Sequence, residues 1–304
     1  MSAESSRTAG AAGAGSPDPV AIFEGARPRL LGLAYRMLGV MADAEDIVQE
    51  AWLRWQGEDP ANIERPDAWL TTVTTRLALD RLRSAQRRRE RYVGPWLPEP
   101  ILVAPGPEDA ADLAESLTLG FLVLLDQLQP VERAAFLLAD VFRVPYAEVA
   151  ASLGKSEAAC RQVVSRARKR LGTAPVRRPT GGERRVLEEL VSAILRGDVE
   201  AAVARLAPDV VLVADGGADR KAARRPIVGA EKVVRLLTSL ARQLTGTVEA
   251  EFVVLNREPG LLIVIDGMVD TAVTLDLAGD RVSAIWLVRN PEKLNRLREP
   301  SVLE

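Results

Sequence analysis

The sequence predicts a multidomain protein in which two all-α domains precede an α+β domain. Three observations lead to this prediction. Apolar residues recur at helical spacing through residues 18–92 and again through 113–174. Two short helical segments separated by a glycine lie within residues 145–171, which is the arrangement of a helix-turn-helix. From residue 183 onward, helical segments are followed by β-rich segments, the order expected of an α+β domain.

Composition excludes several classes of chemical site. The chain has 304 residues, of which 47% are hydrophobic and 27% charged, a balance typical of globular domains. It contains no histidine and one cysteine, Cys160. Ser-His and Cys-His catalysis, His-based metal sites and internal disulfides are therefore excluded. We expect no catalytic residues, no metal and no cofactor.

Two features bear on localisation. Residues 1–17 are mostly Ala, Gly and Ser, and we expect a disordered tail there rather than a secretory signal. No apolar run approaches the ~20 residues of a membrane span. We therefore expect a cytoplasmic protein that has no membrane partner.

Residues 18–92 are predicted to form the first helical domain. Helical spacing of apolar residues indicates a helix from about Ile22 to Met37. A second helix is expected over about 43–56. A third should begin at Pro66, a favourable first-turn residue, and end near residue 89.

Two linkers should flank the second helical domain, residues 113–174. Residues 93–112 are rich in proline, and residues 175–182 contain further Pro and Gly, so neither segment should have regular structure.

Two basic runs stand out although the net charge is −2. Residues 76–91 contain seven arginines and two acids, and residues 161–178 contain seven Lys or Arg and no acid. One such run fits a solvated helix face as well as a nucleic-acid site. Two runs, each at the end of a helical bundle, favour contact with phosphates.

The helix-turn-helix is the strongest single motif. A short helix is predicted from Pro145 to Leu153, Gly154 ends it, and Ser156 is suited to cap the next helix. The inward positions of that next helix are Ala159, Val163, Ala167 and Leu171. Donors that suit base edges and phosphates occupy the opposite face: Arg161, Gln162, Ser165, Arg166 and Lys169. An ordinary helical hairpin with a charged surface is the alternative, but the turn spacing and the one-sided basic face favour DNA recognition.

Residues 183–298 are predicted to form the α+β domain. Helices are expected at about 183–196, 198–206 and 230–243, and strands at 210–213, 247–255, 261–266, 268–277 and 281–288. Glycines at 260, 267 and 279 supply turns between the last four strands. These four strands should therefore form an antiparallel meander.

Residues 126–171, from Asp-Gln-Leu-Gln-Pro-Val-Glu-Arg through the helix-turn-helix to Ala-Arg-Lys-Arg-Leu, resemble the domain of extracytoplasmic-function sigma factors that reads the −35 promoter element. Residues 44–55, Ala-Glu-Asp-Ile-Val-Gln-Glu-Ala-Trp-Leu-Arg-Trp, resemble the helix by which sigma factors bind core RNA polymerase. This resemblance implies that the outward Asp46, Gln49 and Glu50 contact the polymerase.

Residues 66–83 resemble the part of a sigma factor that reads the −10 element. The resemblance implies DNA contacts by Thr72, Thr75, Arg76, Arg83 and Arg87. Many relatives have Asn where this chain has Arg76.

The order of elements after residue 183 resembles the cone-shaped fold of nuclear transport factor 2 and SnoaL-type polyketide cyclases. Three strings are similar to those of sigma factors that carry such an extension: Gly-Pro-Trp-Leu-Pro-Glu-Pro at 94–100, Asp-Gly-Gly at 215–217 and Asn-Pro-Glu-Lys-Leu at 290–294. The resemblance implies an interdomain regulatory contact made by Trp96, Leu97, Pro98, Asp215, Gly216, Gly217, Asn290, Pro291 and Lys293. In relatives the second string continues with Gly-Lys. Here Asp219 occupies the cation's place, which leaves Arg220 and Lys221 as alternative replacements.

Trp96 is an unusual residue for a proline-rich linker unless something covers its ring. We expect the third domain to dock on the linker at 94–100, whereas the alternative is that Trp96 packs only on its own helical domain. Docking would regulate the helical domains in cis at high effective concentration, so that no separate anti-sigma factor is required.

These features together predict a sigma factor that directs core RNA polymerase to specific promoters and is regulated in cis by a SnoaL-like domain. One alternative is a helix-turn-helix activator that does not bind the polymerase. The other is a sigma factor fused to a small-molecule-sensing or cyclase-like enzymatic domain. Asp266 and Asp270 near strand ends are the candidate acid/base residues, and the apolar cone is a candidate ligand pocket. The lack of histidine argues against catalysis.

Overall fold

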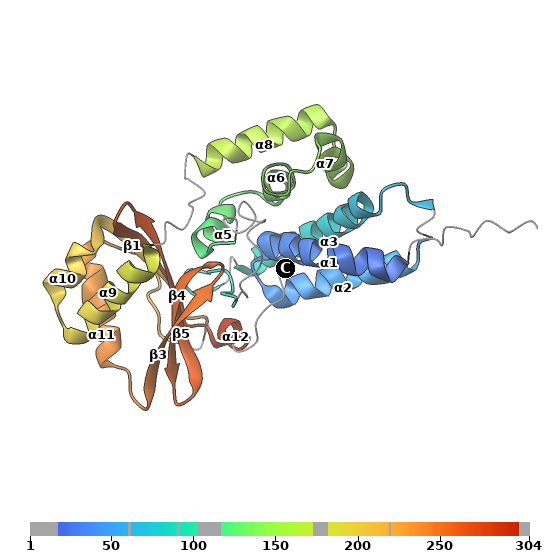
Figure 1. Ribbon diagram of the computed structural model, residues 1–304. Helices are drawn as coiled ribbons and strands as arrows, with labels where there is room; N and C mark the ends of the chain where they lie inside the picture. The colour runs from blue at the N-terminus through green and yellow to red at the C-terminus, as the bar shows by residue number, and fades with distance from the viewer. Residues whose placement is uncertain are drawn as a thin grey trace, which may run out of the picture.

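The computed structural model describes residues 18–59, 62–89, 92–102, 117–172, 182–218 and 220–297. The predicted tail, the later part of the first linker and nearly all of the second linker lie outside these residues. Figure 1 shows the sheet with its own helices at one end of the molecule, and the helices of the two all-α parts together at the other.

The first helical part contains α1 (Pro19–Leu38), α2 (Met41–Gln56) and α3 (Pro66–Arg89). Asp18 caps α1, because its carboxylate accepts a hydrogen bond from the backbone N of Val20 at 3.0 Å. α1 ends at Gly39, which has a φ of 70° in the left-handed region that favours glycine. The three helices pack around the buried side chains of Tyr35, Met37 and Trp55.

The second helical part contains α5 (Leu119–Leu125), α6 (Pro130–Phe136), the π-helical turn η3 (Leu137–Val141), α7 (Tyr146–Leu153) and α8 (Glu157–Leu171). One apolar cluster includes Leu33 and Leu82 of the first part together with Leu125 and Leu137 of the second. The two all-α parts therefore share a core and pack directly on each other.

The third part begins with α9 (Glu183–Arg196) and α10 (Val199–Ala204), and α11 (Ala230–Arg242) follows the second strand. Its six strands are β1 (Leu206–Asp215), β2 (Ile227–Val228), β3 (Val248–Leu255), β4 (Glu258–Ile265), β5 (Met268–Ala278) and β6 (Arg281–Val288), and α12 (Pro291–Leu294) comes last. The sheet order is β2-β1-β6-β5-β4-β3. β3 to β6 form the expected antiparallel meander. β1 adds to it in parallel beside β6, a pairing that the sequence did not indicate.

Both faces of this sheet are apolar, because alternate residues of each strand belong to different cores. Leu261 and Ile285 pack on one face with α9, α10 and α11. On the opposite face, Leu262 and Val264 pack with Leu97 of the linker and Leu119 of α5. The linker and the second helical part therefore cover a sheet face that would otherwise be exposed to water.

None of the described helices combines the length and apolar character that a bilayer crossing requires.

Candidate functional site

The helix-turn-helix forms as its cap residues predict. Gly154 ends α7 with a φ of 63°, and the Ser156 hydroxyl accepts a hydrogen bond from the backbone N of Ala159 at 3.2 Å. The buried side chains of α8 are Cys160, Val163, Val164 and Ala167, whereas the predicted inward residues Ala159 and Leu171 are only half-buried. All five predicted donors, Arg161, Gln162, Ser165, Arg166 and Lys169, are exposed on the other face.

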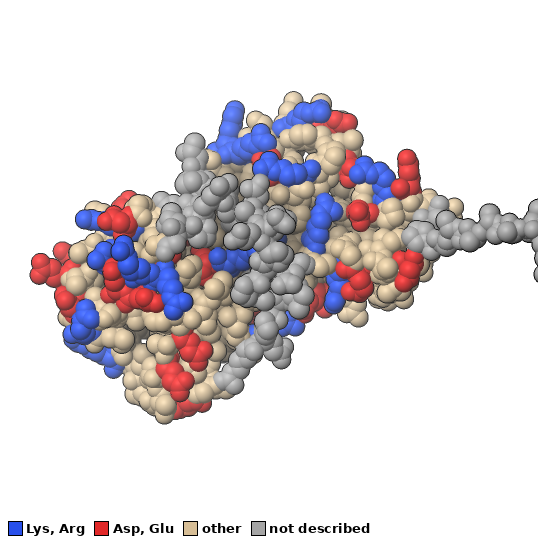
Figure 2. All heavy atoms as spheres, in the orientation of Figure 1, with Lys and Arg blue, Asp and Glu red and all other residues tan. Residues whose placement is uncertain are grey.

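The cations of α8 differ in their local partners. Arg161 pairs with Glu157 at 2.8 Å, and its guanidinium lies 5.0 Å from the centre of the Tyr146 ring. The guanidinium of Arg168 donates two hydrogen bonds to Asp140, at 2.7 and 2.6 Å. Arg166 and Lys169 make no ion pair with any residue that the structure describes. Figure 2 shows Lys and Arg side chains gathered along α8, so that this helix presents a cationic surface.

The predicted −10 face of α3 contacts α7. The hydroxyls of Thr72 and Ser152 lie 2.9 Å apart. Arg76 donates to the backbone oxygens of Ser152 and Ala151 at 3.2 and 2.7 Å, and so satisfies carbonyls at the C-terminal end of α7. Near the start of α3, Arg65 pairs with Glu148 at 2.6 Å. In this arrangement the second helical part contacts two of the residues expected to contact DNA, of which Thr72 is half-buried and Arg76 stays exposed.

The other three residues of this prediction have different surroundings. Thr75 is buried, and its hydroxyl donates to the backbone oxygen of Thr71 at 2.7 Å. The helical period turns position 75 inward, so Thr75 does not offer its hydroxyl to solvent in this arrangement, and its contact with DNA stays a prediction. Arg83 and Arg87 are exposed, and Arg83 pairs with Asp80 at 3.1 Å.

The predicted polymerase-binding residues Asp46, Gln49 and Glu50 are exposed on one face of α2. Leu53 lies on the same face and is 60% exposed, so an apolar side chain stands among the acids. Asp46 pairs with Arg81 at 2.8 Å, and Glu50 with Arg54 at 2.7 Å. Next to them, Glu45 pairs with Arg296 of the third part at 2.8 Å.

The three strings that resembled a sigma-factor subgroup meet around Asp215. This carboxylate is fully buried and accepts four hydrogen bonds. Oδ2 accepts from Leu97 N at 2.9 Å and from Lys293 Nζ at 2.6 Å. Oδ1 accepts from the Tyr92 hydroxyl at 2.6 Å and from Gly217 N at 3.0 Å.

Lys293 and Asn290 connect the same site to the linker. Lys293 Nζ also donates to the backbone oxygen of Leu97 at 2.5 Å, and Asn290 Nδ2 donates to the Tyr92 hydroxyl at 2.8 Å. Burial lowers the pKa of Lys293 to about 8, although the charge of Asp215 opposes this shift. A buried ion pair carries a large desolvation penalty, and the removal of one partner leaves an uncompensated charge.

The cation that pairs with Asp215 is thus Lys293, and the structure places neither Arg220 nor Lys221 at this carboxylate. Arg220 lies 3.4 Å from Asp270 instead. Asp219 itself lies outside the described residues. The remaining predicted contact residues are at the same place: Pro98, Gly216 and Gly217 are buried, and Pro291 begins α12.

Trp96 is half-buried between the first helical part and the third part. A Cβ at Gly39 would lie 2.7 Å from its ring, so a glycine is needed there for close approach as well as for the positive φ. The guanidinium of Arg89 lies 3.2 Å from the ring centre, and Lys293 Nζ lies 4.2 Å from it. The two expectations for Trp96 are therefore not exclusive, because the ring contacts its own helical part and the third part together.

A second set of contacts, around Asn256, had no signal in the sequence. Asn256 lies in the β3–β4 turn with a φ of 50° and is fully buried. Its Oδ1 accepts a hydrogen bond from Ile101 N at 3.0 Å, and its backbone N donates to Ile101 O at 2.9 Å. Its Nδ2 donates to the Tyr35 hydroxyl at 2.8 Å. Tyr35 in turn donates to the backbone oxygen of Glu99 at 2.6 Å. An asparagine between two strands is typical of a turn, and nothing local distinguishes it as an interdomain contact.

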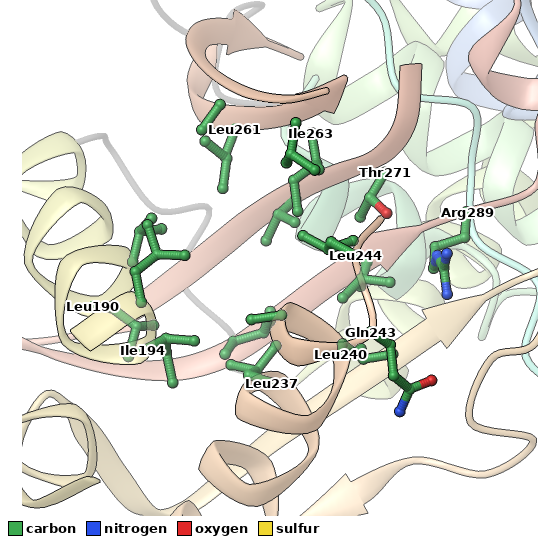
Figure 3. Close-up of a pocket in the computed structure, with 18 of the residues that line it drawn as sticks. Leu190, Ile194, Leu237, Leu240, Gln243, Leu244, Leu261, Ile263, Thr271 and Arg289 are labelled. Atoms are coloured by element: carbon green, nitrogen blue, oxygen red, sulfur yellow. The ribbon is translucent and has the colours of Figure 1, made fainter. Parts of the chain in front are cut away.

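The third part encloses a cavity of about 720 Å³ between α9, α11 and the sheet. Figure 3 shows leucine and isoleucine side chains along it, with Thr271, Gln243 and Arg289 toward one end. The predicted acid/base candidates do not belong to the described lining. Asp266 accepts from Thr247 N in a turn, and Asp270 is held by Arg289 at 2.9 Å. Among the described residues no cluster of three or more potential metal ligands exists.

Comparison with known proteins gives concordant matches. The family described as Sigma-70 region 2 matches residues 22–88, and that described as Sigma-70, region 4 matches residues 119–171. The ECF RNA polymerase sigma factor SigJ of Mycobacterium tuberculosis is 41% identical over 289 residues, which cover 90% of this chain and 92% of SigJ. The probable ECF sigma factor SigI of the same species is 30% identical, with coverage of 92% and 97%.

The crystal structure of M. tuberculosis SigJ aligns with a TM-score of 0.73 at 36% identity, and the alignment covers 91% of this chain and 99% of that one. This extent includes the third part, so the predicted fold class is confirmed: two helical sigma domains are followed by an α+β, SnoaL-like cone. The alternative of an activator that does not bind polymerase is set aside, as is an assignment to an enzyme family. The chain belongs to the extracytoplasmic-function sigma factors, which bind core RNA polymerase and direct it to promoter DNA.

Proposed function

We propose that the SnoaL-like domain regulates this sigma factor in cis, by holding the linker and the two DNA-reading domains in the arrangement described above. The observation that carries the proposal is the buried carboxylate of Asp215, which is bonded to Leu97 N of the linker and to Lys293 Nζ. Because regulator and target share one chain, docking is intramolecular, and no separate anti-sigma factor is required.

The sense of the regulation is inhibitory. Thr72 and Arg76 contact α7, so the two domains must separate before α3 can reach the −10 element. The linker that would have to move is pinned by Asp215, Lys293 and Asn256. Release of these contacts would therefore favour separation and raise transcription.

The residues that bind polymerase and DNA follow from this proposed mechanism. Core polymerase binds the exposed face of α2 through Asp46, Gln49 and Glu50, in the cytoplasm, where the polymerase is located. Thr72, Arg76, Arg83 and Arg87 contact the −10 region once α7 has moved away. Arg161, Gln162, Ser165, Arg166 and Lys169 contact the −35 region. The cavity of the third domain binds a small molecule that modulates docking, since its size falls within the range of small-molecule sites.

In vitro transcription with core polymerase over a promoter library tests the regulation. Trp96→Ala, Lys293→Met and truncation after Arg289 should each raise promoter-dependent transcription. Trp96→Ala combined with either of the others should add little, because the residues share one interaction. Lys232→Met is the matched control, because this exposed lysine of α11 lies away from the linker.

Unchanged transcription in all three variants, or effects that simply add, would overturn the regulatory proposal. A fall in transcription with intact polymerase binding would instead overturn its inhibitory sense, since the docked domain would then brace a productive arrangement.

A further inference from the structure

We propose that the cavity of the third domain binds a small amphipathic carboxylate, whose apolar body lies between α9, α11 and the sheet. Its head group contacts Arg289, Arg220 and Lys221. The effect on transcription rests on the regulation proposed above, but the binding itself does not.

The body of the cavity selects an apolar occupant. Its volume is about 720 Å³, and six of its lining residues are Leu190, Ile194, Leu237, Leu240, Leu261 and Ile263. In Figure 3 these side chains converge from the helices and from the sheet. Water gains few hydrogen bonds from such walls, whereas an apolar ligand removes their surface from water.

The head-group end selects a negative charge. The described lining residues include three cations, Arg220, Lys221 and Arg289, and no acid. Gln243 lies at the same end, and its side-chain amide, which gives one hydrogen bond to Ser239, keeps a second N–H as a further donor. A carboxylate accepts bonds from guanidinium and ammonium groups with greater strength than a neutral oxygen does.

Arg289 and Arg220, here called the arginine cluster, leave one hydrogen-bond donor unsatisfied without a ligand. Among the described carboxylates, Asp270 is the one that Arg289 and Arg220 share, at 2.9 and 3.4 Å. Within the described part of the chain, Nε of Arg289 is buried and has no hydrogen-bond partner. A buried donor without an acceptor costs free energy, so a second carboxylate at this place would complete the cluster.

The same residues are joined to the docking site. The backbone N of Arg289 donates to Asp215 O at 2.7 Å, and the backbone N of Arg220 donates to Gly216 O at 3.1 Å. Arg289 directly precedes Asn290, whose amide holds Tyr92. A head group that draws Arg289 or Arg220 away from Asp270 would thus act on residues adjacent to the linker contacts.

Calorimetric titration of the full chain with decanoate and with decanol tests the assignment, because these probes share an apolar tail and differ in the head. Decanoate should bind at least tenfold more tightly than decanol. Arg289→Met should reduce decanoate affinity roughly tenfold and leave decanol affinity unchanged, and Ala241→Trp, which fills the cavity, should abolish both. Arg196→Met, an exposed arginine of α9 outside the described lining, is the matched control.

Arg289→Met leaves the buried Asp270 without its closest cation. Lys221→Met, a change at an exposed side chain, therefore provides a second test of the same expectation. Equal affinity for the two probes, or no binding of decanoate at millimolar concentration by a chain that melts cooperatively, would overturn the inference. Either result leaves the proposed regulation intact, since no polymerase takes part. Conversely, transcription that is insensitive to Trp96→Ala would reject the regulation and leave a measured decanoate site standing.

Discussion

The exposed donors of α8 have different local partners, and this difference predicts different roles in DNA binding. Arg161→Ala or Gln162→Ala should relax the preference at particular −35 positions by about 1–3 kcal/mol for each lost base contact. Lys169→Ala should weaken binding evenly across sequences and reduce its salt dependence, because Lys169 makes no ion pair with a described residue and is suited to a phosphate. Binding to a library of −35 sequences at several salt concentrations measures both effects.

Arg168→Ala is the control for these variants. Its guanidinium already makes two hydrogen bonds to Asp140, so the loss of this arginine should change DNA affinity least. Equal and uniform losses for Arg161, Gln162 and Lys169 would mean that α8 positions the protein on DNA without reading bases.

The acids of α2 predict a polymerase contact. Asp46→Lys combined with Glu50→Lys should weaken binding to core polymerase strongly. The resemblance to sigma factors implies a basic polymerase surface opposite these acids, so like charges would face each other across the interface. The fold should persist, since both side chains are exposed and Arg81 keeps Asp43 as a partner at 3.2 Å. Glu24→Lys, which reverses a single exposed acid of α1, is the control for charge reversal elsewhere on the surface. Wild-type affinity of the double variant in a polymerase pull-down would show that the interface lies elsewhere.

At the scale of elements, Arg76 links α3 to the end of α7. Arg76→Ala should loosen this contact by roughly 1 kcal/mol, because two backbone carbonyls lose a charged donor near the surface. Hydrogen exchange of the α7 amides should then accelerate. Arg83→Ala removes an exposed arginine of the same helix, whose ion pair among the described residues is with Asp80, so it should leave α7 unchanged. Equal exchange in the two variants would mean that Arg76 does not hold the helices together.

Elements with local end signals were predictable, and elements defined by distant partners were not. The helix at 183–196 and the turn formed by Gly154 and Ser156 lie where their residues indicate. β1 was expected over 210–213 but spans Leu206–Asp215, because its parallel pairing with β6 extends it. β2 has two residues and is held in the sheet by its pairing with β1, so no local periodicity marks it.

The interdomain site was predictable only in part, for the same reason. The contact between Asp215, Leu97 and Lys293 was expected only from the resemblance to sigma factors that carry a C-terminal extension. No periodicity relates residues that are so distant in the sequence. Thr75 was expected at the DNA because its hydroxyl suits a phosphate, and its burial beside Thr71 and Ala78 was not anticipated. Asn256 and Tyr35 meet across 221 positions, and neither residue is unusual in its own segment.

Across the whole molecule, the third domain is bound to both helical domains by one apolar sheet face. Leu97 of the linker and Leu119 of α5 both pack on that face. The backbone N of Leu119 also donates to Glu258 Oε1 at 3.0 Å, so that a buried carboxyl group of β4 meets the start of α5. Burial, with a further contribution from the charge of Asp276, raises the pKa of Glu258 to about 8.

This raised pKa predicts that the assembly of the three domains weakens as pH rises. The folded chain keeps the Glu258 proton up to about pH 8, whereas the unfolded chain releases it near the ordinary value of 4.5. Between these values the folded state binds more protons, so its stability should fall by on the order of a few kcal/mol as pH rises from about 5 to 8. Glu258→Gln keeps the acceptor for Leu119 N and carries no proton that titrates. Its melting temperature should therefore match that of the wild type near pH 5, exceed it near pH 8, and lose this part of the slope between them. Glu251→Gln, on the exposed part of β3, should retain the wild-type slope. If Glu258→Gln melts with the wild-type dependence on pH, the carboxyl group at the α5 contact is already ionised in the folded protein, and the docking of α5 on the sheet does not depend on its proton.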